Sequence, residues 1–321
     1  MSKYLSLFVL AFLSYLSLGV VAGEFDGKKV LYIDSYHEGY AWSDGMTESI
    51  VGIIGESGAE LKIHRMDTKR NKTVEFKQKA ALDAKKLIES FQPDVVIATD
   101  DNASKYLLAP YYKGSSIPFV FAGVNWDATP YGFPTSNITG MVEVNAYPDL
   151  LDLLNSMARG EKVGFLSGPG ETGALVVERS KKILGLEISE VRQANTFEEW
   201  KSSFIDLNGK VDVLLLNNNA GITDWDKEAA KQFVERNTKI PTGSTNAWML
   251  DYSLMTYAKL ASEQGEWAAL TAMRILLGES PADIPIERNK RGDIGINKRV
   301  ASAIGVTVSE NIEFSASIVI E

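Results

Sequence analysis

The stretch VLYIDSYHEGYAWSDG, residues 30–45, decides the fold. It opens with an apolar run ending at Asp34, which has the length and composition of a buried strand. Polar and aromatic residues follow at once. In an open α/β sheet, ligands bind at the loops that follow the carboxyl ends of the strands. The sequence therefore predicts that the segment after Asp34 forms one wall of a binding cleft.

Five side chains of this segment are candidate ligand contacts: Ser35, Tyr36, His37, Tyr40 and Trp42. Aromatic rings can stack on a planar ligand or hold a cation over a ring face, with about 0.5–2 kcal/mol per contact. Packing in the core is the alternative for the aromatic side chains. A hydrogen bond within the loop is the alternative for the histidine. The residues alone leave these alternatives open.

Helices and strands alternate through the rest of the first half. Helices are expected at 44–55 and at 73–91, where Thr73 is the N-cap. Strands are expected at 60–66, 93–99 and 117–122, and a further helix should run toward Tyr112. This alternation is typical of a doubly wound parallel sheet. The last two strand ends supply further candidate contacts: Asp100, Asp101, Asn102, Asn125 and Trp126.

The second half repeats this order in three matched segments: 162–166 with 29–33, 211–220 with 93–103, and 240–248 with 117–126. Helices are expected at 171–184, at 196–204 with a Thr196/Glu199 capping box, and at 224–237. The repeat predicts two similar α/β lobes whose strand-end loops converge. The second lobe then contributes nine candidate contacts: Gly168, Glu171, Thr172, Asn217, Asn218, Asn219, Thr245, Asn246 and Trp248.

The tail does not continue the repeat. A helix is expected at 260–277, short extended pieces at 284–286 and 294–296, and a last helix to residue 304 capped by Asn297. Elements left over after two complete lobes indicate that the chain crosses back between them. Several crossings would form a hinge.

Composition narrows the classes of protein. The 321 residues carry a net charge of −9 and no cysteine. Disulfides, thiolate metal sites and cysteine nucleophiles are therefore excluded. No run of lysine and arginine stands out, so nucleic acid is not an expected partner.

The N-terminus has the pattern of a secretory signal peptide at residues 1–22. Lys3 precedes an apolar run from residue 5 to 21, and Val20-Val21-Ala22 offers small residues for cleavage. An uncleaved anchor is the alternative, since the run is near the shortest length that spans a bilayer. Cleavage would give an exported protein, which in a Gram-negative cell resides in the periplasm.

Six segments together resemble a periplasmic substrate-binding protein of the ABC-transporter type, with the type I periplasmic-binding fold. They are SYHEGYAWSDG at 35–45, IATDDNA at 97–103, FVFAGVNWD at 119–127, GMVEV at 140–144, GFLSGPGE at 164–171 and LLGESPADIPIE at 276–287. The first two also resemble a branch found as extracellular sensor domains. Other members of the wider family look like carriers of aromatic amino acids.

This resemblance implies a hinge with three crossings, near Met141, Met255 and Gly278, and capture of ligand by hinge closure. The first lobe would comprise 28–141 plus 257–278, and the second 142–256 plus 279–321. Glu143, beside the first crossing, joins the candidate contacts.

Asp100 and Asp101 have three interpretations. One carboxylate can hold a ligand ammonium, the pair can belong to a metal site, or Asp101 can cap the helix that follows. Adjacent side chains seldom face the same way, so we expect one contact and one cap. With two histidines and no cysteine in the chain, no metal is expected.

Residues 168–173 read G-x-G-x-x-G between an expected strand and helix, which is also the context of a dinucleotide fingerprint. The motif stands in the second lobe, and the equivalent first-lobe loop lacks its glycines. We therefore expect no cofactor. The glycines are expected instead to let the backbone approach a ligand carboxylate or phosphate.

The sequence thus predicts capture of a small polar or aromatic solute, preferably an amino acid, for delivery to an ABC transporter permease. Asp100 or Asp101 would hold the ammonium, and second-lobe amides and hydroxyls the carboxylate. A sensor that signals to a separate membrane kinase or cyclase is one alternative. An exported α/β enzyme is another, although no set of catalytic residues can be proposed from the spacing.

Overall fold

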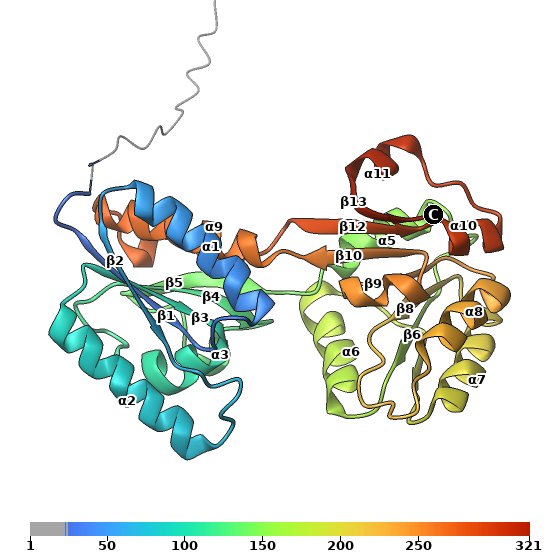
Figure 1. Ribbon diagram of the computed structural model, residues 1–321, viewed down its shortest axis with the longest axis horizontal. Helices are drawn as coiled ribbons and strands as arrows, with labels where there is room; N and C mark the ends of the chain where they lie inside the picture. The colour runs from blue at the N-terminus through green and yellow to red at the C-terminus, as the bar shows by residue number, and fades with distance from the viewer. Residues whose placement is uncertain (1–22, 24) are drawn as a thin grey trace, which may run out of the picture.

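Two α/β lobes lie side by side and are joined by extended segments that pass between them (Figure 1). The structure is a computed structural model that describes residue 23 and residues 25–321. The signal peptide predicted at 1–22 lies outside the described residues. Each lobe has a central sheet flanked by helices, which confirms the predicted fold class.

The first sheet contains only parallel strand pairings. Its strand order is β11-β5-β4-β3-β1-β2, with β1 Lys29–Asp34, β2 Glu60–Arg65, β3 Val95–Thr99, β4 Phe119–Asn125, β5 Ile138–Glu143 and β11 Glu287–Arg288. Strands β3 and β5 are buried along their whole length, as expected where helices cover both faces. Because the strands are parallel, their carboxyl ends meet at one edge, where Asp34, Asp100 and Glu143 lie.

The second sheet has the order β13-β12-β10-β9-β8-β6-β7. Its strands are β6 Val163–Ser167, β7 Glu190–Gln193, β8 Val213–Leu216, β9 Thr242–Ser244, β10 Met255–Lys259, β12 Gly292–Asn297 and β13 Ala316–Ile320. Only β10 and β12 pair antiparallel among these strands. β12 lies beside β10 as β11 lies beside β5 in the first sheet, and β13 is an additional edge strand.

Helices of the first lobe cover both faces of its sheet (Figure 1). They are α1 Ala41–Glu56, α2 Val74–Phe91, α3 Asp100–Ala103, the π-helix η1 Ser104–Leu108, α4 Ala109–Tyr111, the 3-10 turns η2 Thr129–Tyr131 and η4 Pro281–Asp283, and α9 Ala261–Leu276. Thr73 caps α2 as predicted, because its side chain accepts a bond from the Phe76 amide.

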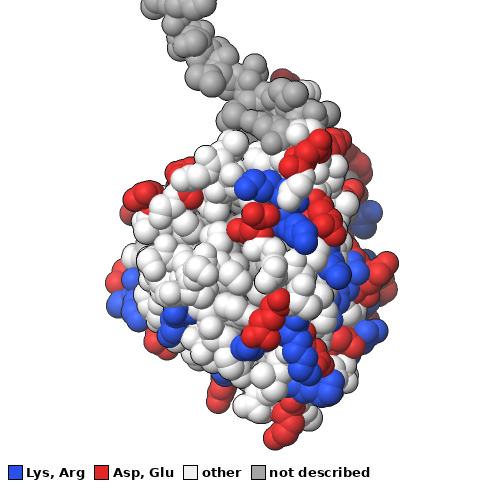
Figure 2. Space-filling model, turned by 90° about the vertical axis from the view of Figure 1, so that its left-hand side faces the viewer, with Lys and Arg blue, Asp and Glu red and all other residues white. Residues whose placement is uncertain are grey.

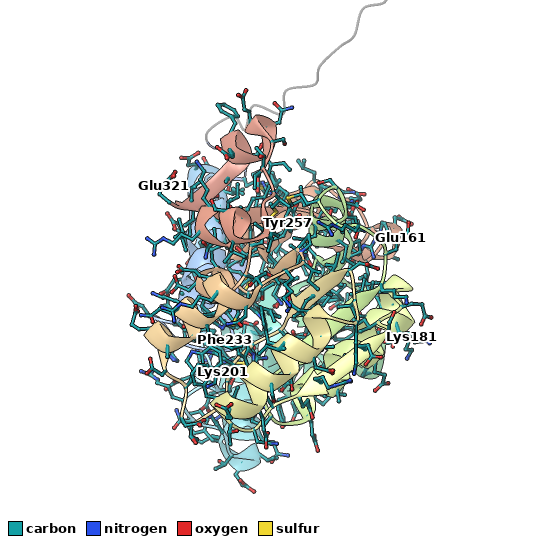
Figure 3. The ribbon with its side chains drawn as sticks, turned by 90° about the vertical axis from the view of Figure 1, so that its right-hand side faces the viewer. Glu161, Lys181, Lys201, Phe233, Tyr257 and Glu321 are labelled. Carbon is teal, nitrogen blue, oxygen red and sulfur yellow. The ribbon has the colours of Figure 1, made fainter. Side chains whose placement is uncertain are left out.

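The second lobe carries α5 Tyr147–Asn155, α6 Glu171–Leu184, α7 Phe197–Asn208, α8 Lys227–Asn237, the 3-10 helix η3 Ala247–Tyr252, α10 Lys298–Ile304 and α11 Glu310–Ser315. Thr196 and Asn297 cap α7 and α10, as predicted from sequence. Aromatic side chains of α7 and α8 pack together: the ring centroid of Phe233 on α8, labelled in Figure 3, lies 6.1 Å from that of Trp200 on α7.

The third crossing differs from its predicted place near Gly278. The chain remains with the first sheet through β11, where Glu287 pairs with Met141, and crosses at residues 289–291. Ile284 is 2% exposed in the first-lobe core, and its carbonyl accepts a 2.7 Å bond from the Thr139 hydroxyl. These contacts hold residues 281–288 against β5, so assigning all of 279–321 to the second lobe was wrong.

The other two crossings also differ slightly from the residues expected. The first follows β5 at residues 144–146, a few residues beyond Met141. The second follows β10 at Leu260, five residues beyond Met255. Three passages between the sheets therefore form the hinge.

Close packing of α1 on α9 depends on Gly265. A Cβ atom there would collide with the Met46 carbonyl oxygen and would lie 2.9 Å from the Met46 Cα. Because these obstacles are backbone atoms, Gly265→Ala should force the helices apart and lower the free energy of unfolding by about 1–3 kcal/mol. Gly52→Ala is the matched control, since Gly52 lies in α1 with nothing within 4 Å of an added Cβ.

The control should stabilise the protein by about 0.5–1 kcal/mol, because alanine loses less conformational freedom than glycine in a helix. Urea unfolding of both variants measures the difference. Equal stabilisation by the two alanines would contradict the packing described for Gly265.

The outer face of the first lobe carries acidic and basic side chains interspersed, and much of that face is uncharged (Figure 2). Among the residues that the structure describes, no helix has the length and apolar character needed to cross a membrane.

Candidate functional site

A pocket of about 310 Å³ lies between the lobes. It includes seven of the predicted contacts: Asn125, Trp126, Thr172, Asn217, Asn218, Asn246 and Trp248. Five lining residues were not predicted: Asn145, Leu175, Val176, Arg179 and Lys259. Strand-end loops of both lobes and the hinge therefore meet at one pocket, as the repeated sequence pattern indicated.

One face of α6 forms much of the second-lobe wall. Thr172, Leu175, Val176 and Arg179 are spaced at i, i+3, i+4 and i+7, so they lie on the same side of the helix. Within the described part of the chain, Arg179 makes no ion pair. This wall therefore offers a cation that is free to bind an anionic group.

Amide side chains complete the same wall. The Asn217 side chain donates to the Ser167 hydroxyl at 3.2 Å, and the Asn246 side chain donates to the Asn217 carbonyl. These bonds fix the loops after β6, β8 and β9 relative to one another. The edge of the second sheet is thus a preorganised set of polar groups.

The glycines of residues 168–173 have structural explanations other than the one predicted. A Cβ at Gly168 would meet the Ala220 carbonyl oxygen at 2.5 Å, and one at Gly173 would meet the Ser167 hydroxyl at 2.6 Å. Gly170 has φ +103°, in the left-handed region that favours glycine. Gly168 and Gly173 therefore allow close packing within the lobe, and neither lines the pocket.

Four carboxyl groups gather at the carboxyl edge of the first sheet: Asp34, Asp100, Asp101 and Glu143. Glu143 forms an ion pair with Lys259, which connects β5 to β10 across the hinge. Burial raises the pKa of Glu143, and the attraction of Lys259 opposes that rise. Lys259 also donates to the Asn145 side chain at 3.1 Å, so it contacts both the end of β5 and the first crossing.

Asp100 and Asp101 have different roles. Both oxygens of Asp101 accept bonds, from Tyr131 at 2.7 Å and from Asn125 at 2.6 Å. Asp100 is 2% exposed, has φ +67°, and its Oδ2 has no hydrogen-bond partner among the described residues. Burial and then the neighbouring carboxylates raise the pKa of Asp100 well above its usual value.

Asp101 is not the helix cap that we expected. Helix α3 begins one residue earlier, at Asp100, and its N-cap position is Thr99. Asp101 instead faces the side chains of the β4 end and the turn that follows it. In the described residues, no group of three or more acidic or histidine side chains is arranged to hold a metal ion.

The aromatic side chains divide into two groups. Trp42 lies in the first turn of α1 and not in a loop, because this helix begins at Ala41. Its Nε1 is buried without a partner, and the Lys259 ammonium lies 5.9 Å from its ring centroid. Tyr36 and Tyr40 form an edge-to-face pair with centroids 5.4 Å apart.

Several predicted contacts are structural instead. Ser35 is fully buried, donates to the Thr99 carbonyl and accepts from the Ala103 amide at 2.8 Å, so its hydroxyl binds within the lobe and is not accessible to a ligand. His37 bonds the Glu38 carbonyl at 2.8 Å, which is the loop role given as its alternative. Eleven others also lie outside the pocket lining: Tyr36, Tyr40, Trp42, Asp100, Asp101, Asn102, Glu143, Gly168, Glu171, Asn219 and Thr245.

The residues missed by sequence analysis differ in how readily they could have been found. Arg179 is seven residues after Thr172, so extending the predicted helix face by two turns would have included it. Lys259 and Asn145 belong to hinge segments, and their approach depends on how the lobes join. No pattern in the neighbouring sequence indicates that Lys259 and Asn145 lie together.

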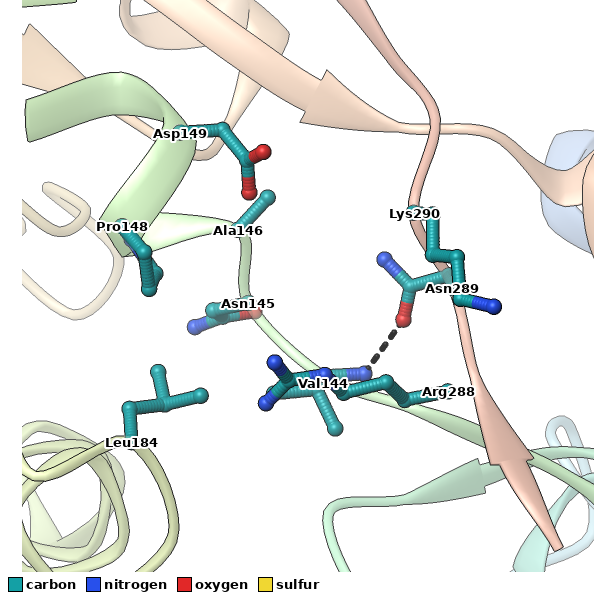
Figure 4. Close-up of a pocket in the computed structure, with 9 residues that line it drawn as sticks. All are labelled: Val144, Asn145, Ala146, Pro148, Asp149, Leu184, Arg288, Asn289 and Lys290. Atoms are coloured by element: carbon teal, nitrogen blue, oxygen red, sulfur yellow. Dashed lines mark hydrogen bonds between the residues drawn. The ribbon is translucent and has the colours of Figure 1, made fainter. Parts of the chain in front are cut away.

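A smaller pocket of about 160 Å³ lies at the hinge itself (Figure 4). The Asn289 side chain, on the third crossing, accepts a 2.7 Å bond from the Val144 amide on the first crossing. This buried bond holds two of the three crossings together. None of the predicted contacts lines this pocket.

Two similar lobes around a hinged pocket define the class of two-lobed binding proteins with the type I periplasmic-binding fold. The model of the ABC transporter substrate binding protein family matches residues 40–320. The chain belongs to that family. A comparison with curated proteins gave no match.

Solved structures share the fold at low identity. The ligand-free, open structure of a substrate-binding protein with adhesive properties from Clostridium difficile is 18% identical, covers 91% of this chain and 99% of its own, and has a TM-score of 0.71. An ABC domain from Streptococcus pneumonia in complex with L-Trp has the same identity and coverages and a TM-score of 0.52. A periplasmic ribose ABC transporter protein from Conexibacter woesei is 14% identical over 89% and 98% of the two chains, with a TM-score of 0.54.

Proposed function

We propose that this binding protein captures an amino acid or a similar zwitterion between its lobes and presents it to a membrane permease. The observation that carries the proposal is the opposite chemistry of the first-lobe edge and the second-lobe wall. The first-lobe edge has four carboxyl groups beside the pocket, none of which is part of its lining, whereas the second-lobe wall has Arg179 and a set of amides. A ligand with one cationic and one anionic end fits this polarity.

The first lobe supports binding of an ammonium group. One oxygen of Asp100 has no hydrogen-bond partner among the described residues, whereas both oxygens of Asp101 already accept hydrogen bonds. We therefore propose that Asp100, and not Asp101, holds the ammonium. The rings of Trp42 and Trp126 lie near the same edge and would contact the apolar part of the ligand.

The second lobe supports binding of a carboxylate. Arg179 can donate two parallel bonds to one carboxylate, and the side chains of Asn218, Asn246 and Thr172 add neutral donors. Contacts with both lobes would favour the closed form, since a ligand shifts a conformational equilibrium only by binding one state better.

Calorimetric titration with a panel of amino acids tests the proposal. We expect at least one to bind. If none binds, while a neutral sugar or an inorganic anion does, the proposed ligand class is wrong. Native mass spectrometry of gently purified protein would identify a ligand that remains bound from the cell.

Arg179→Met should weaken binding of that amino acid by about 1.5–3 kcal/mol, because a charged hydrogen-bond donor to the carboxylate is lost. Lys181→Met is the matched control. It removes the same charge from α6, but Lys181 pairs with Glu187 on the exposed side of the helix (Figure 3). Calorimetry on both variants measures the difference, and an equal loss would indicate a general charge effect.

Delivery to a permease and location in the periplasm complete the proposal. They are supported by membership of the substrate-binding family. Deleting the gene should abolish uptake of the radiolabelled amino acid that the protein binds, and fractionation should recover the protein with periplasmic markers. Unchanged uptake in the deletion strain would contradict the transport role.

A further inference from the structure

The ammonium group of Lys69 occupies a cation site in the first lobe. The Lys69 ammonium lies 4.8 Å from the ring centroid of Tyr36 and 4.7 Å from that of Tyr40. The two rings are perpendicular, with an interplanar angle of 90°, so they form two sides of a small aromatic cage. Cages of this kind bind primary and quaternary ammonium groups.

The loop after β2 aims Lys69 at this cage. The amide of Asp67 donates to the Tyr36 carbonyl at 2.7 Å, and the amide of Thr68 donates to the Ser35 carbonyl at 3.0 Å. The Thr68 hydroxyl donates to the same Ser35 carbonyl at 2.6 Å. Because the two preceding residues are fixed to the β1 end, the Lys69 side chain is directed over the rings.

The cage lies within the field of the acidic edge. Asp100, Asp101 and Glu143 all raise the pKa of the Tyr36 hydroxyl, after the larger effect of burial. The charge of Lys69 in turn stabilises the ionised forms of Asp100 and Glu143.

Lys69 forms no ion pair within 4 Å in the part of the chain that the structure describes, and it is an exposed residue. Ring faces and a diffuse negative field therefore hold its ammonium, without a direct carboxylate bond. Such a cation can be exchanged at low cost. The Asp100 carboxylate, with its unpartnered oxygen, stays nearby as an additional attraction for an incoming cation.

We propose that Lys69 is an internal stand-in for the cationic group of the ligand, so that an arriving ammonium displaces it from the Tyr36–Tyr40 cage. This inference rests on the proposed binding of an ammonium-bearing solute and adds a competitor built into the same site. Four carboxyl groups face three cations there, Arg65, Lys69 and Lys259. Only a ligand that brings a positive charge can replace Lys69 without increasing the excess of negative charge.

Tetramethylammonium chloride, titrated calorimetrically against sodium chloride at equal ionic strength, is the test. Lys69→Met keeps an apolar stem but removes the competing charge, so it should bind tetramethylammonium about fivefold to thirtyfold more tightly than the unchanged protein. Lys72→Met, which removes a charge from the same exposed loop, should bind like the unchanged protein. Adding Tyr36→Leu to Lys69→Met should remove the gain.

A second measurement follows Lys69 directly. Acylation of surface lysines, read by mass spectrometry, should increase at Lys69 when tetramethylammonium is present and remain constant at Lys72. Equal or weaker binding by Lys69→Met, or no binding by either protein, would overturn the inference. If an amino acid binds the unchanged protein, but tetramethylammonium binds neither the unchanged protein nor Lys69→Met, the inference is overturned and the proposed function stays intact.

Discussion

Asp100→Asn should stabilise the ligand-free protein and, at the same time, weaken its binding of an amino acid. The Asp100 carboxylate is buried beside Asp34, Asp101 and Glu143, and one of its oxygens has no partner among the described residues. An amide of the same shape removes the repulsion and brings two donors toward carboxylate acceptors. We expect the free energy of unfolding at neutral pH to increase by about 1–3 kcal/mol.

The pH dependence of this gain has a definite sign. The pKa of Asp100 is raised in the folded protein, so the folded state holds the proton more tightly than the unfolded state. Below the unfolded pKa of about 3.9 both states are protonated and the carboxyl group costs no stability. As pH rises through the unfolded pKa toward the raised folded one, that cost develops. The stabilisation by Asp100→Asn should therefore vanish in acid and reach its maximum above the folded pKa.

Asp100→Asn should weaken amino-acid binding although it increases stability. Removing one partner of a desolvated charge pair typically costs about 2–5 kcal/mol, so affinity for the amino acid should fall by at least about thirtyfold. Asp83→Asn is the matched control, because it removes the same charge at a surface position paired with Lys79 and Lys86. Chemical unfolding and calorimetry measure the two effects. A variant that loses both stability and binding would show that Asp100 is a structural residue.

Local chemistry explains which parts of the fold could be predicted. The caps at Thr73, Thr196 and Asn297 depend on residues within one helical turn, and all three were predicted. The buried parallel strands are apolar runs bounded by polar residues, which identifies them without knowledge of their neighbours.

Elements that depend on distant partners were predicted less well. β11 has two residues, Glu287–Arg288, and is a strand only because β5 offers it an edge. β13 and α11, after residue 309, were not predicted, and Phe314 there is 93% exposed. An exposed segment leaves no apolar periodicity in the sequence to indicate its structure.

In the site too, features set by local sequence could be predicted, and features that depend on distant partners could not. Strand-end loops were identified because the rule for parallel sheets depends only on strand direction. The difference between Asp100 and Asp101 was not, because it depends on the left-handed backbone of Asp100 and on the bonds that Tyr131 and Asn125 supply. Likewise, Lys69 reaches the tyrosine rings through a loop anchored by backbone bonds that no residue pattern reveals.

Trp200→Ala should cause the largest loss of stability among the changes considered. Trp200 is 1% exposed on α7, and its ring centroid lies 5.2 Å from that of Phe204 and 5.0 Å from that of Trp225. Truncating a buried tryptophan removes its transfer free energy and leaves a cavity that rigid neighbouring rings cannot fill. We expect the free energy of unfolding to fall by about 3–5 kcal/mol, a large fraction of the 5–15 kcal/mol typical of whole proteins.

Trp248→Ala provides the contrast, because Trp248 is 63% exposed and lines the pocket between the lobes. Its removal should leave unfolding in urea within about 0.5 kcal/mol of the unchanged protein, as for most surface substitutions. It should nevertheless weaken amino-acid binding severalfold, since an aromatic contact with the ligand is lost. Trp200→Ala should show the reverse at a temperature where it remains folded: low stability, with an affinity close to that of the unchanged protein. If both variants lost stability equally, Trp248 would be packed against the lobe and not available to the ligand.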